Sequence, residues 1–156
     1  MEPASTAMDL SSKTLEPIRI LFVEDEFLIR EWIAQALTER GFSVKRASNA
    51  MEALRQIACG SVDILLTDIN LRGGMDGTAL ARRMRELNPN LPIIYASARA
   101  TLLEQGARMP GSLVLAKPYD PATLARLLLV ALRAAKHPEP APAAEAAPSA
   151  AALEPV

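Results

Sequence analysis

The chain has 156 residues, with 17 Lys or Arg and 18 Asp or Glu, so its formal net charge is -1. This length suffices for one domain with a substantial core, and two full domains are not expected. The near-neutral charge gives no general attraction to nucleic acid or an anionic membrane, so neither is expected as a partner. The single cysteine, Cys59, excludes an intrachain disulfide and a cysteine-rich metal site, and it is compatible with a reducing cytoplasm.

Both ends of the sequence differ in composition from the part between them. Residues 1–16 are small and polar without periodicity, and they lack the basic and apolar regions of a secretory signal. Residues 136–156 are rich in Ala and Pro, a composition that cannot form a core or a continuous helix. We therefore expect a disordered N-terminal extension over 1–16, one domain over 17–135 and a disordered tail over 136–156. No apolar run reaches the length of a membrane span, which favours a cytoplasmic location.

Residues 17–135 alternate short apolar runs with stretches of helical periodicity, starting with "IRILFV". A helix is predicted next over residues 27–40, with Gly41 at its end. Its apolar positions share one face: Ile29, Ile33, Ala36 and Leu37. "FSVKRA" predicts a weaker second strand. A helix is predicted to begin at Asn49, because Glu52 three residues later makes a variant of the capping box.

The second half of the domain continues the alternation. "VDILLTD" predicts a third strand, and a short helix over residues 78–86 follows it. "IIYASA" and "LVLAKP" predict the last two strands, and a short or mobile fourth helix is predicted between them near residues 102–108. Asp120 and Pro121 begin a final helix that ends near residue 135. Because most strands are near-continuous apolar runs, the sequence predicts an α/β fold with a doubly wound five-stranded parallel sheet, (βα)₅.

Polar side chains stand at the end of four of these strands. Glu24 and Asp25 follow the first strand, Asp68 ends the third, Ser97 ends the fourth and Lys117 ends the fifth. In an open parallel α/β sheet, ligands bind beyond the carboxyl ends of the strands, near the point where the strand order reverses. We therefore expect these five side chains to form one site.

The charges of this predicted site indicate its chemistry. Three carboxylates at close range repel one another unless a cation lies among them, and a divalent ion together with Lys117 would balance them. All-oxygen ligands favour Mg²⁺, with Mn²⁺ as the alternative. A carboxylate nucleophile, a metal, an ammonium and the Ser97 hydroxyl are the parts that phosphoryl transfer needs. We therefore predict that Asp68 becomes an aspartyl phosphate.

Five separate motifs in the right order carry a resemblance to a known family: "VEDE", "LLTDINL", "MDG", "YASA" and "AKPY". Over about residues 18–134 the chain resembles a response-regulator receiver domain, in particular the single-domain, chemotaxis-receiver-like kind, which has a flavodoxin-like fold. The resemblance implies that Asp25 and Asp68 are side-chain ligands of Mg²⁺. It also implies that Glu24 acts through water and that Asn70 offers its backbone carbonyl.

The same resemblance implies the function. Asp68 is the phosphoacceptor, Ser97 and Lys117 assist the transfer, and the phosphodonor is a sensor histidine kinase or a histidine phosphotransfer protein. The domain catalyses its own phosphorylation and dephosphorylation and is not otherwise an enzyme. No output domain is expected after Ala135, so we expect a stand-alone response regulator of a two-component phosphorelay. It would signal through an unknown downstream protein or act as a phosphate sink.

One departure from the family pattern concerns switching, and two further positions concern the lifetime of the phosphoryl group. The aromatic residue that the family often has three positions before the lysine is Val114 here, although Tyr95 and Tyr119 are close in sequence to Ser97 and Lys117. The family positions that influence water access to the phosphoryl group hold Asn70 and Arg99.

Two alternative functions remain at this point. A phosphatase similar to the haloacid dehalogenase class would also use Asp, Ser, Lys and Mg²⁺. Its general acid, however, would stand two positions after the nucleophile, where this chain has Asn70. A binding module that keeps the fold without phosphorylation would carry an unused and repulsive group of carboxylates.

Overall fold

The computed structural model describes residues 15–99 and 108–137. Five parallel strands form one sheet in the order β2-β1-β3-β4-β5. The strands are β1 (Arg19–Val23), β2 (Ser43–Ala47), β3 (Ile64–Asp68), β4 (Ile93–Ser97) and β5 (Leu113–Ala116). The helices of the described ranges are α1 (Phe27–Glu39), α2 (Ala50–Ala58), α3 (Gly77–Leu87) and α4 (Pro121–Lys136). The predicted doubly wound α/β fold is confirmed.

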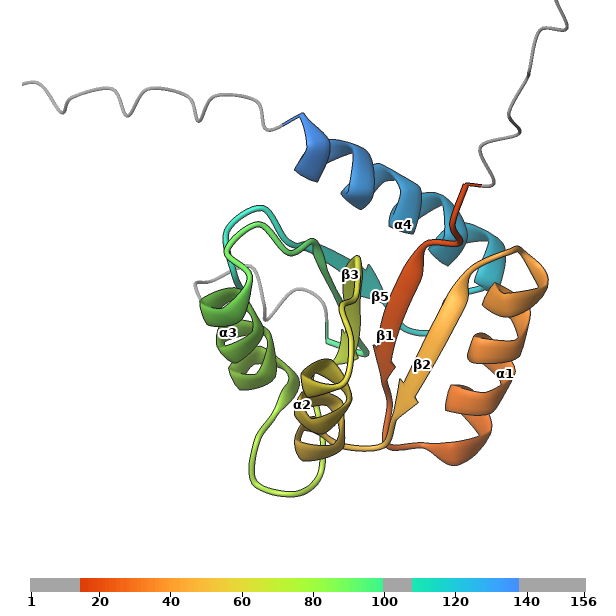
Figure 1. Ribbon diagram of the computed structural model, residues 1–156. Coiled ribbons are helices and arrows are strands. Elements are labelled where there is room, and N and C mark those ends of the chain that lie inside the picture. Colours follow the sequence, from red (N-terminus) through yellow and green to blue (C-terminus); the bar gives the residue numbers. More distant parts are fainter. Residues whose placement is uncertain (1–14, 100–107, 138–156) are drawn as a thin grey trace, which may run out of the picture.

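The helices cover both faces of the sheet, α1 and α4 on one side and α2 and α3 on the other (Figure 1). Successive side chains of a strand point to opposite faces. On β1, Ile20 and Phe22 pack against α1 and α4, whereas Leu21 and Val23 pack against α2 and α3. The four residues are fully buried. Burial on both faces explains why the central strands are uninterrupted apolar runs.

The chain reverses its direction across the sheet at β1. From β1 it passes to β2 on one side, and it then returns to β3 on the other. The carboxyl ends of β1 and β3 therefore lie side by side where the connections diverge, which is the usual binding position in such a sheet. Glu24 follows β1 directly and Asp68 is the last residue of β3.

Short polar side chains begin three of the helices. Asn49, Asp76 and Asp120 each accept a hydrogen bond from the backbone N–H three residues later, as N-cap residues do. The predicted start of α2 is confirmed. The reciprocal bond expected in a capping box is shifted by one residue, because the Glu52 carboxylate accepts it from the backbone N–H of Ser48.

Of the other predictions about helices, one is wrong at a single residue and one falls largely outside the described residues. On α1 the side chain of Ala34 is buried instead of that of Ala36. The helix predicted near residues 102–108 falls outside the described residues except for Arg108. No helix in the described ranges is long and apolar enough to cross a membrane.

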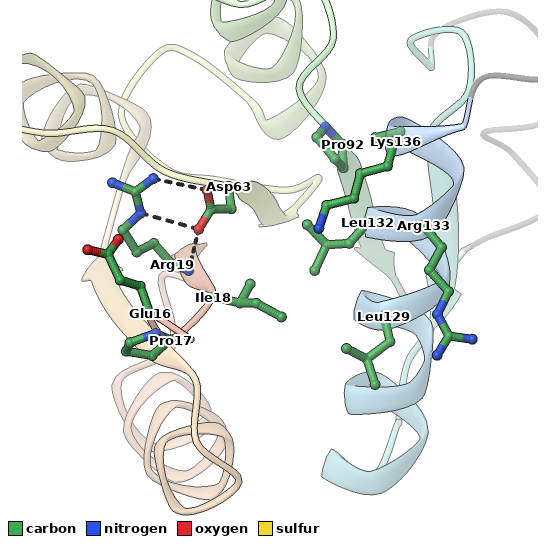
Figure 2. A pocket seen from close by; sticks show the side chains of 11 residues that line it. Glu16, Pro17, Ile18, Arg19, Asp63, Pro92, Leu129, Leu132, Arg133 and Lys136 are labelled. Atoms are coloured by element: carbon green, nitrogen blue, oxygen red, sulfur yellow. Dashed lines mark hydrogen bonds and ion pairs between the residues drawn. The ribbon is translucent and has the colours of Figure 1, made fainter. Parts of the chain in front are cut away.

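A groove of about 520 Å³ lies at the amino-terminal end of the sheet, between the start of β1 and α4 (Figure 2). One wall is the ion pair of Arg19 and Asp63, which are 3.0 Å apart. The side chain of Lys136 reaches toward the groove from α4. Because Arg19 and Asp63 stand at the beginning of strands, this groove is separated from Asp68 by the length of the sheet.

Candidate functional site

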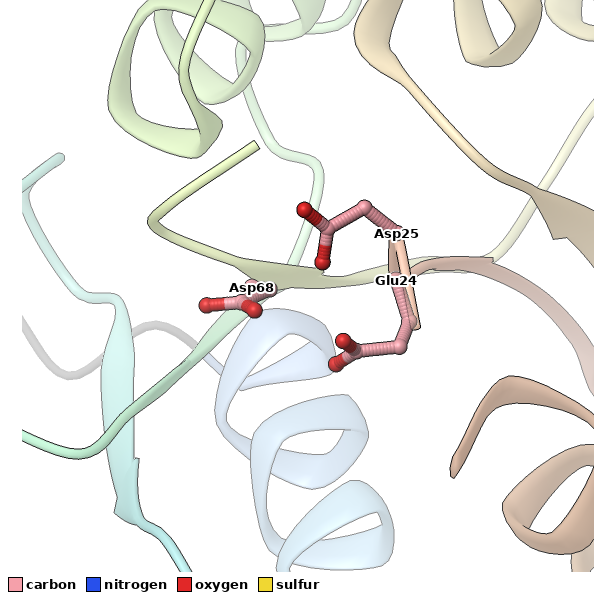
Figure 3. A group of neighbouring side chains, drawn as sticks. All are labelled: Glu24, Asp25 and Asp68. Carbon is pink, nitrogen blue, oxygen red and sulfur yellow. The ribbon is translucent and has the colours of Figure 1, made fainter. Parts of the chain in front are cut away.

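Three carboxylates converge at the carboxyl end of the sheet. Glu24 and Asp25 come from the residues after β1, and Asp68 comes from the end of β3 (Figure 3). One oxygen of each lies within 4.8 Å of the other two. The structure therefore brings together the acidic residues that the sequence predicted as neighbours.

Lys117 joins two of these carboxylates. Its Nζ lies 2.9 Å from Glu24 Oε2 and 2.9 Å from Asp68 Oδ2. Lys117 follows β5, which is separated from β3 by β4, so its long side chain reaches back across the ends of the strands. The pairing of Lys117 with Asp68 agrees with the sequence interpretation, and the direct contact with Glu24 was not foreseen.

The environment of this ion pair shifts two pKa values. Burial raises the pKa of Glu24 above its usual value, and the hydrogen bond from Lys117 offsets part of this effect. Burial alone would lower the pKa of Lys117, but the bonds to Asp68 and Glu24 outweigh it, so this pKa is raised. Lys117 thus remains an ammonium in the ordinary pH range. It neutralises a Glu24 carboxylate that is only 1% exposed.

The carboxylate of Asp68 is held on both oxygens. Its Oδ2 contacts Lys117, and its Oδ1 accepts a hydrogen bond of 3.2 Å from the backbone N–H of Asn70. The side chain is about 10% exposed, so it is positioned firmly while keeping access to solvent. The structure places Asn70 beside Asp68 through this bond.

Gly77, the first residue of α3, packs against the backbone of Asp68. Its N–H donates a 2.8 Å hydrogen bond to the carbonyl oxygen of Ile69. A Cβ atom at position 77 would overlap the carbonyl group of Asp68 and also approach Ile69 within 2.9 Å. In the sequence this glycine stands out only as part of the "MDG" motif. Because it has an ordinary φ angle, its requirement for close packing could not be read from turn chemistry.

Ser97 occupies the same edge through the register of β4. Its neighbour Ala96 pairs with Asp68, and the carbonyl oxygen of Ser97 accepts a 2.8 Å bond from the N–H of Lys117. The Ser97 hydroxyl accepts a 3.0 Å hydrogen bond from the N–H of Arg99. Ser97 is 3% exposed, so its hydroxyl is fixed near the acidic residues by main-chain contacts.

The donor set of this site fits a hard divalent cation. Among the described residues, the cations in ion-pair contact with the three carboxylates are Lys117 and Arg72. Arg72 is 3.4 Å from Asp25 but 91% exposed, so solvent screens its charge. The three carboxylates therefore keep a net negative charge, and their oxygens are ligands of the kind that Mg²⁺ prefers.

Val114 lies on β5 at the position where the family often has an aromatic residue. Val114 pairs across the sheet with Tyr95 of β4, and the Tyr95 side chain is completely buried. The other tyrosine, Tyr119, has a buried hydroxyl with no hydrogen-bond partner among the described residues. Burial raises the pKa of Tyr119 to about 12. The Tyr95 hydroxyl, in contrast, accepts a 3.1 Å hydrogen bond from the backbone N–H of Met109.

Similarity to known proteins was found for most of the domain. The family model "Response regulator receiver domain" matches residues 20–129. The transcriptional regulatory protein CseB of Streptomyces coelicolor is 34% identical over 120 residues, which are 76% of this chain and 50% of that protein. The sensor histidine kinase RcsC of Salmonella typhimurium is 32% identical over 107 residues, 67% of this chain and 11% of that protein. The chain thus spans half or less of the length of these curated relatives.

Solved structures give the same result. A response regulator receiver protein from Sinorhizobium medicae has a TM-score of 0.72 and 33% identity, over 78% of this chain and 99% of that one. The receiver domain of the hybrid histidine kinase CckA has a TM-score of 0.61 and 34% identity, over 73% of this chain and 98% of that one. Family model, relatives and fold agree, and the chain belongs to the response regulator receiver domain family.

Proposed function

We propose that this protein accepts a phosphoryl group on Asp68 from a phosphohistidine of a sensor histidine kinase or a histidine phosphotransfer protein. The observation that carries the proposal is the position of the Asp68 carboxylate. It is fixed at the end of β3 by Lys117 and the Asn70 N–H, within a cluster of two further carboxylates. A firmly held nucleophile is what an in-line displacement requires.

In the proposed reaction an Asp68 carboxylate oxygen attacks the phosphorus atom. An O–P bond forms, the N–P bond of the phosphohistidine breaks, and its electron pair returns to the imidazole nitrogen. Lys117 is already in contact with Asp68, so its ammonium is placed to stabilise charge on the phosphoryl oxygens. We assign the Ser97 hydroxyl, at the adjacent strand end, the role of hydrogen-bond donor to the phosphoryl oxygens. Attack of water on the phosphorus atom would later break the O–P bond, restore the carboxylate and release inorganic phosphate.

We further propose that Glu24, Asp25 and Asp68 hold Mg²⁺, or Mn²⁺ in its place, together with the backbone carbonyl of Asn70. When bound, the ion would supply positive charge for the phosphoryl oxygens. Glu24 is the most buried of the three carboxylates, at 1% exposed, and like Asp68 it is bonded to Lys117. We therefore assign it an indirect role, through water and through the orientation of Lys117.

The partners are proposed from the same chemistry. Similarity to a sensor histidine kinase and to a transcriptional regulatory protein supports a place in a two-component phosphorelay. We propose that the protein acts as a stand-alone receiver in the cytoplasm, without contacting DNA or a membrane, and that it signals by binding a protein or drains phosphate from a shared kinase. Detection of the protein by immunoblot in cells that produce it naturally tests the stand-alone assignment, since a larger polypeptide would contradict it.

The first experiment is the intact mass of the protein after incubation with a small-molecule phosphodonor such as acetyl phosphate, with and without Mg²⁺. The expected result is a Mg²⁺-dependent gain of one phosphoryl group that is absent from Asp68→Ala. Asp120→Ala is the matched control, because Asp120 is an exposed cap of α4. Phosphorylation of Asp68→Ala to the same extent would contradict the assignment. Failure of the native protein with both acetyl phosphate and a kinase donor would contradict the function.

A further inference from the structure

Arg30 of α1 is a largely buried cation to which the proposed reaction assigns no role. Its side chain is 14% exposed, and its guanidinium lies over the ring of Phe27, 5.5 Å from the ring centre. Its Nη1 donates a 2.8 Å hydrogen bond to the backbone carbonyl oxygen of Glu24, six residues earlier. A long side chain thus folds back from the beginning of α1 onto the residue that follows β1.

This carbonyl group belongs to the peptide unit that joins the two acidic residues. Because a peptide unit is planar, the carbonyl of Glu24 and the N–H of Asp25 turn together. The preceding peptide unit is fixed as well, since the N–H of Glu24 donates a 3.1 Å hydrogen bond to the carbonyl oxygen of Ala47 on β2. The bond from Arg30 therefore sets the direction in which the chain leaves Glu24 and enters Asp25.

The Asp25 carboxylate depends on its main chain more than the other two carboxylates do. Glu24 and Asp68 are each bonded to Lys117 at 2.9 Å. Asp25 pairs instead with Arg72 at 3.4 Å, and Arg72 is 91% exposed. An exposed pair of this kind holds a side chain weakly. The orientation of the Asp25 carboxylate therefore follows mainly from the backbone that Arg30 fixes.

The charge of Arg30 has a partner outside the site. Within the described part of the chain, the carboxylate in ion-pair contact with Arg30 is that of Glu31, at 3.9 Å, and not one of the three site carboxylates. Glu31 also pairs with Arg46 at 3.4 Å, so it keeps a cationic partner without Arg30. Because a cation near the site repels a divalent ion, any contribution of Arg30 to metal binding must come from its hydrogen bond.

We propose that Arg30 is a positioning residue for the divalent ion, because its bond to the Glu24 carbonyl aims the Asp25 carboxylate at the ion. The inference rests on the proposed Mg²⁺ site and adds to it a residue that acts on the ligands. Groups that orient metal ligands raise the affinity, since less order has to be created when the ion binds. The loss of such a group usually weakens metal binding by about tenfold or more.

Three variants of Arg30 separate the bond from the charge. Arg30→Met keeps a long side chain and removes both. Loss of the charge alone would tighten binding of a divalent cation, whereas loss of the bond should weaken it, so the two explanations predict opposite signs. Arg30→Lys keeps the charge and a donor, and it should bind the ion more tightly than Arg30→Met. Arg30→Gln is too short to reach Glu24, and its polar side chain serves if Arg30→Met does not fold.

Arg40→Met is the matched control. Arg40 caps the other end of α1, and its guanidinium also donates to a backbone carbonyl, that of Ala36, at 3.0 Å. This variant removes the same kind of side chain and the same kind of bond from the same helix. It leaves the residues after β1 unchanged.

The experiment titrates Mg²⁺ into the isotope-labelled native protein and each variant and follows the backbone amide signals by NMR. The Kd for Mg²⁺ is expected to rise about tenfold in Arg30→Met and Arg30→Gln, and Arg40→Met should keep the native Kd. The amide signal of Asp25 reports the bond directly, because its peptide unit contains the Glu24 carbonyl. This signal should be shifted in Arg30→Met before Mg²⁺ is added, and it should be unchanged in Arg40→Met.

The outcomes separate this inference from the proposed function. If the native protein binds Mg²⁺ and the folded variants Arg30→Met or Arg30→Gln bind it as tightly or more tightly, the positioning role is wrong and the metal site stands. An equal weakening in Arg40→Met would also overturn the role, because the effect would not depend on Glu24. If the native protein does not bind Mg²⁺, the metal site and this inference are both wrong, whereas phosphorylation of Asp68 is decided by the mass experiment.

Discussion

Gly77 packs against the main chain of Asp68 so closely that any side chain at position 77 would collide with the Asp68 carbonyl group. The N–H of Gly77 also binds the next carbonyl, that of Ile69. The start of α3 therefore packs directly against the end of β3 and helps to fix its position.

We predict that Gly77→Ala lowers the free energy of unfolding by about 1–3 kcal/mol, the usual cost of overpacking, and also slows phosphorylation of Asp68. Urea unfolding and intact mass measure the two effects. The control is Gly41→Ala. Gly41 has a φ of 93° with no atom near the added Cβ, so strain should destabilise the protein and leave phosphorylation unchanged. Equal phosphorylation rates in the two variants would contradict a supporting role for Gly77.

Removal of Lys117 should leave a buried carboxylate without its partner. Lys117→Met is expected to abolish phosphorylation and to lower the free energy of unfolding at pH 7 by about 3 kcal/mol, because breaking a buried pair is costly. The pKa of Glu24 is already raised above 4.5 by burial, and loss of Lys117 raises it further. Since a protonated Glu24 needs no partner, the destabilisation should shrink as the pH falls through that raised pKa.

The double variant Glu24→Gln with Lys117→Met tests this explanation. It should recover most of the stability at pH 7, whereas phosphorylation should stay lost. Lys136→Met, at an exposed lysine of α4, controls for loss of a positive charge. A double variant as unstable as Lys117→Met would show that Glu24 is not the cause.

Divalent ions should stabilise the folded protein. If Mg²⁺ binds the carboxylate cluster, a concentration one hundred times its Kd adds about 2.7 kcal/mol to the free energy of unfolding, seen as a rise in Tm. Asp25→Asn should remove most of this rise, because Asp25 supplies one of the converging oxygens. Asp63→Asn, at the opposite end of the sheet, should keep it. A full Mg²⁺ effect in Asp25→Asn would place the ion elsewhere.

The pair of Arg19 and Asp63 should make stability depend on pH at the acidic end. The Arg19 hydrogen bond holds the pKa of Asp63 below its usual 3.8. The carboxylate therefore contributes stability above that value, and the contribution is lost as the pH falls through the lowered pKa. The pair is partly exposed, so we expect Asp63→Asn to cost about 0.5–1 kcal/mol at pH 7. The difference between the two proteins should shrink as the pH falls through that lowered pKa.

Arg99 should affect how long the phosphoryl group persists. It follows Ser97 by two positions and is exposed at the phosphoacceptor edge, so we expect its side chain to influence the approach of water. We predict that Arg99→Ala changes the rate of dephosphorylation while the extent of Asp68 phosphorylation is retained. The decay of phosphorylated protein, followed by intact mass, measures this rate. Identical decay of the two proteins would contradict the prediction.

The sequence by itself determined the order along the chain of the five strands and the four described helices, and it grouped the residues of the candidate site. Apolar runs marked the buried strands, cap residues such as Asn49 and Asp120 marked helix starts, and a polar residue ended each long strand. In a parallel sheet those ends meet at one edge, so Glu24, Asp25 and Asp68 could be grouped before their positions were known.

Only the tertiary structure decided contacts between residues far apart in the chain. Three such contacts depend on how closely two elements approach each other. They are the bonds of Lys117 to both Glu24 and Asp68, the packing of Gly77 on Asp68, and the bond from Met109 to Tyr95. Local periodicity and turn chemistry carry no information about such distances. They are set by strand register and by the packing of helices on the sheet.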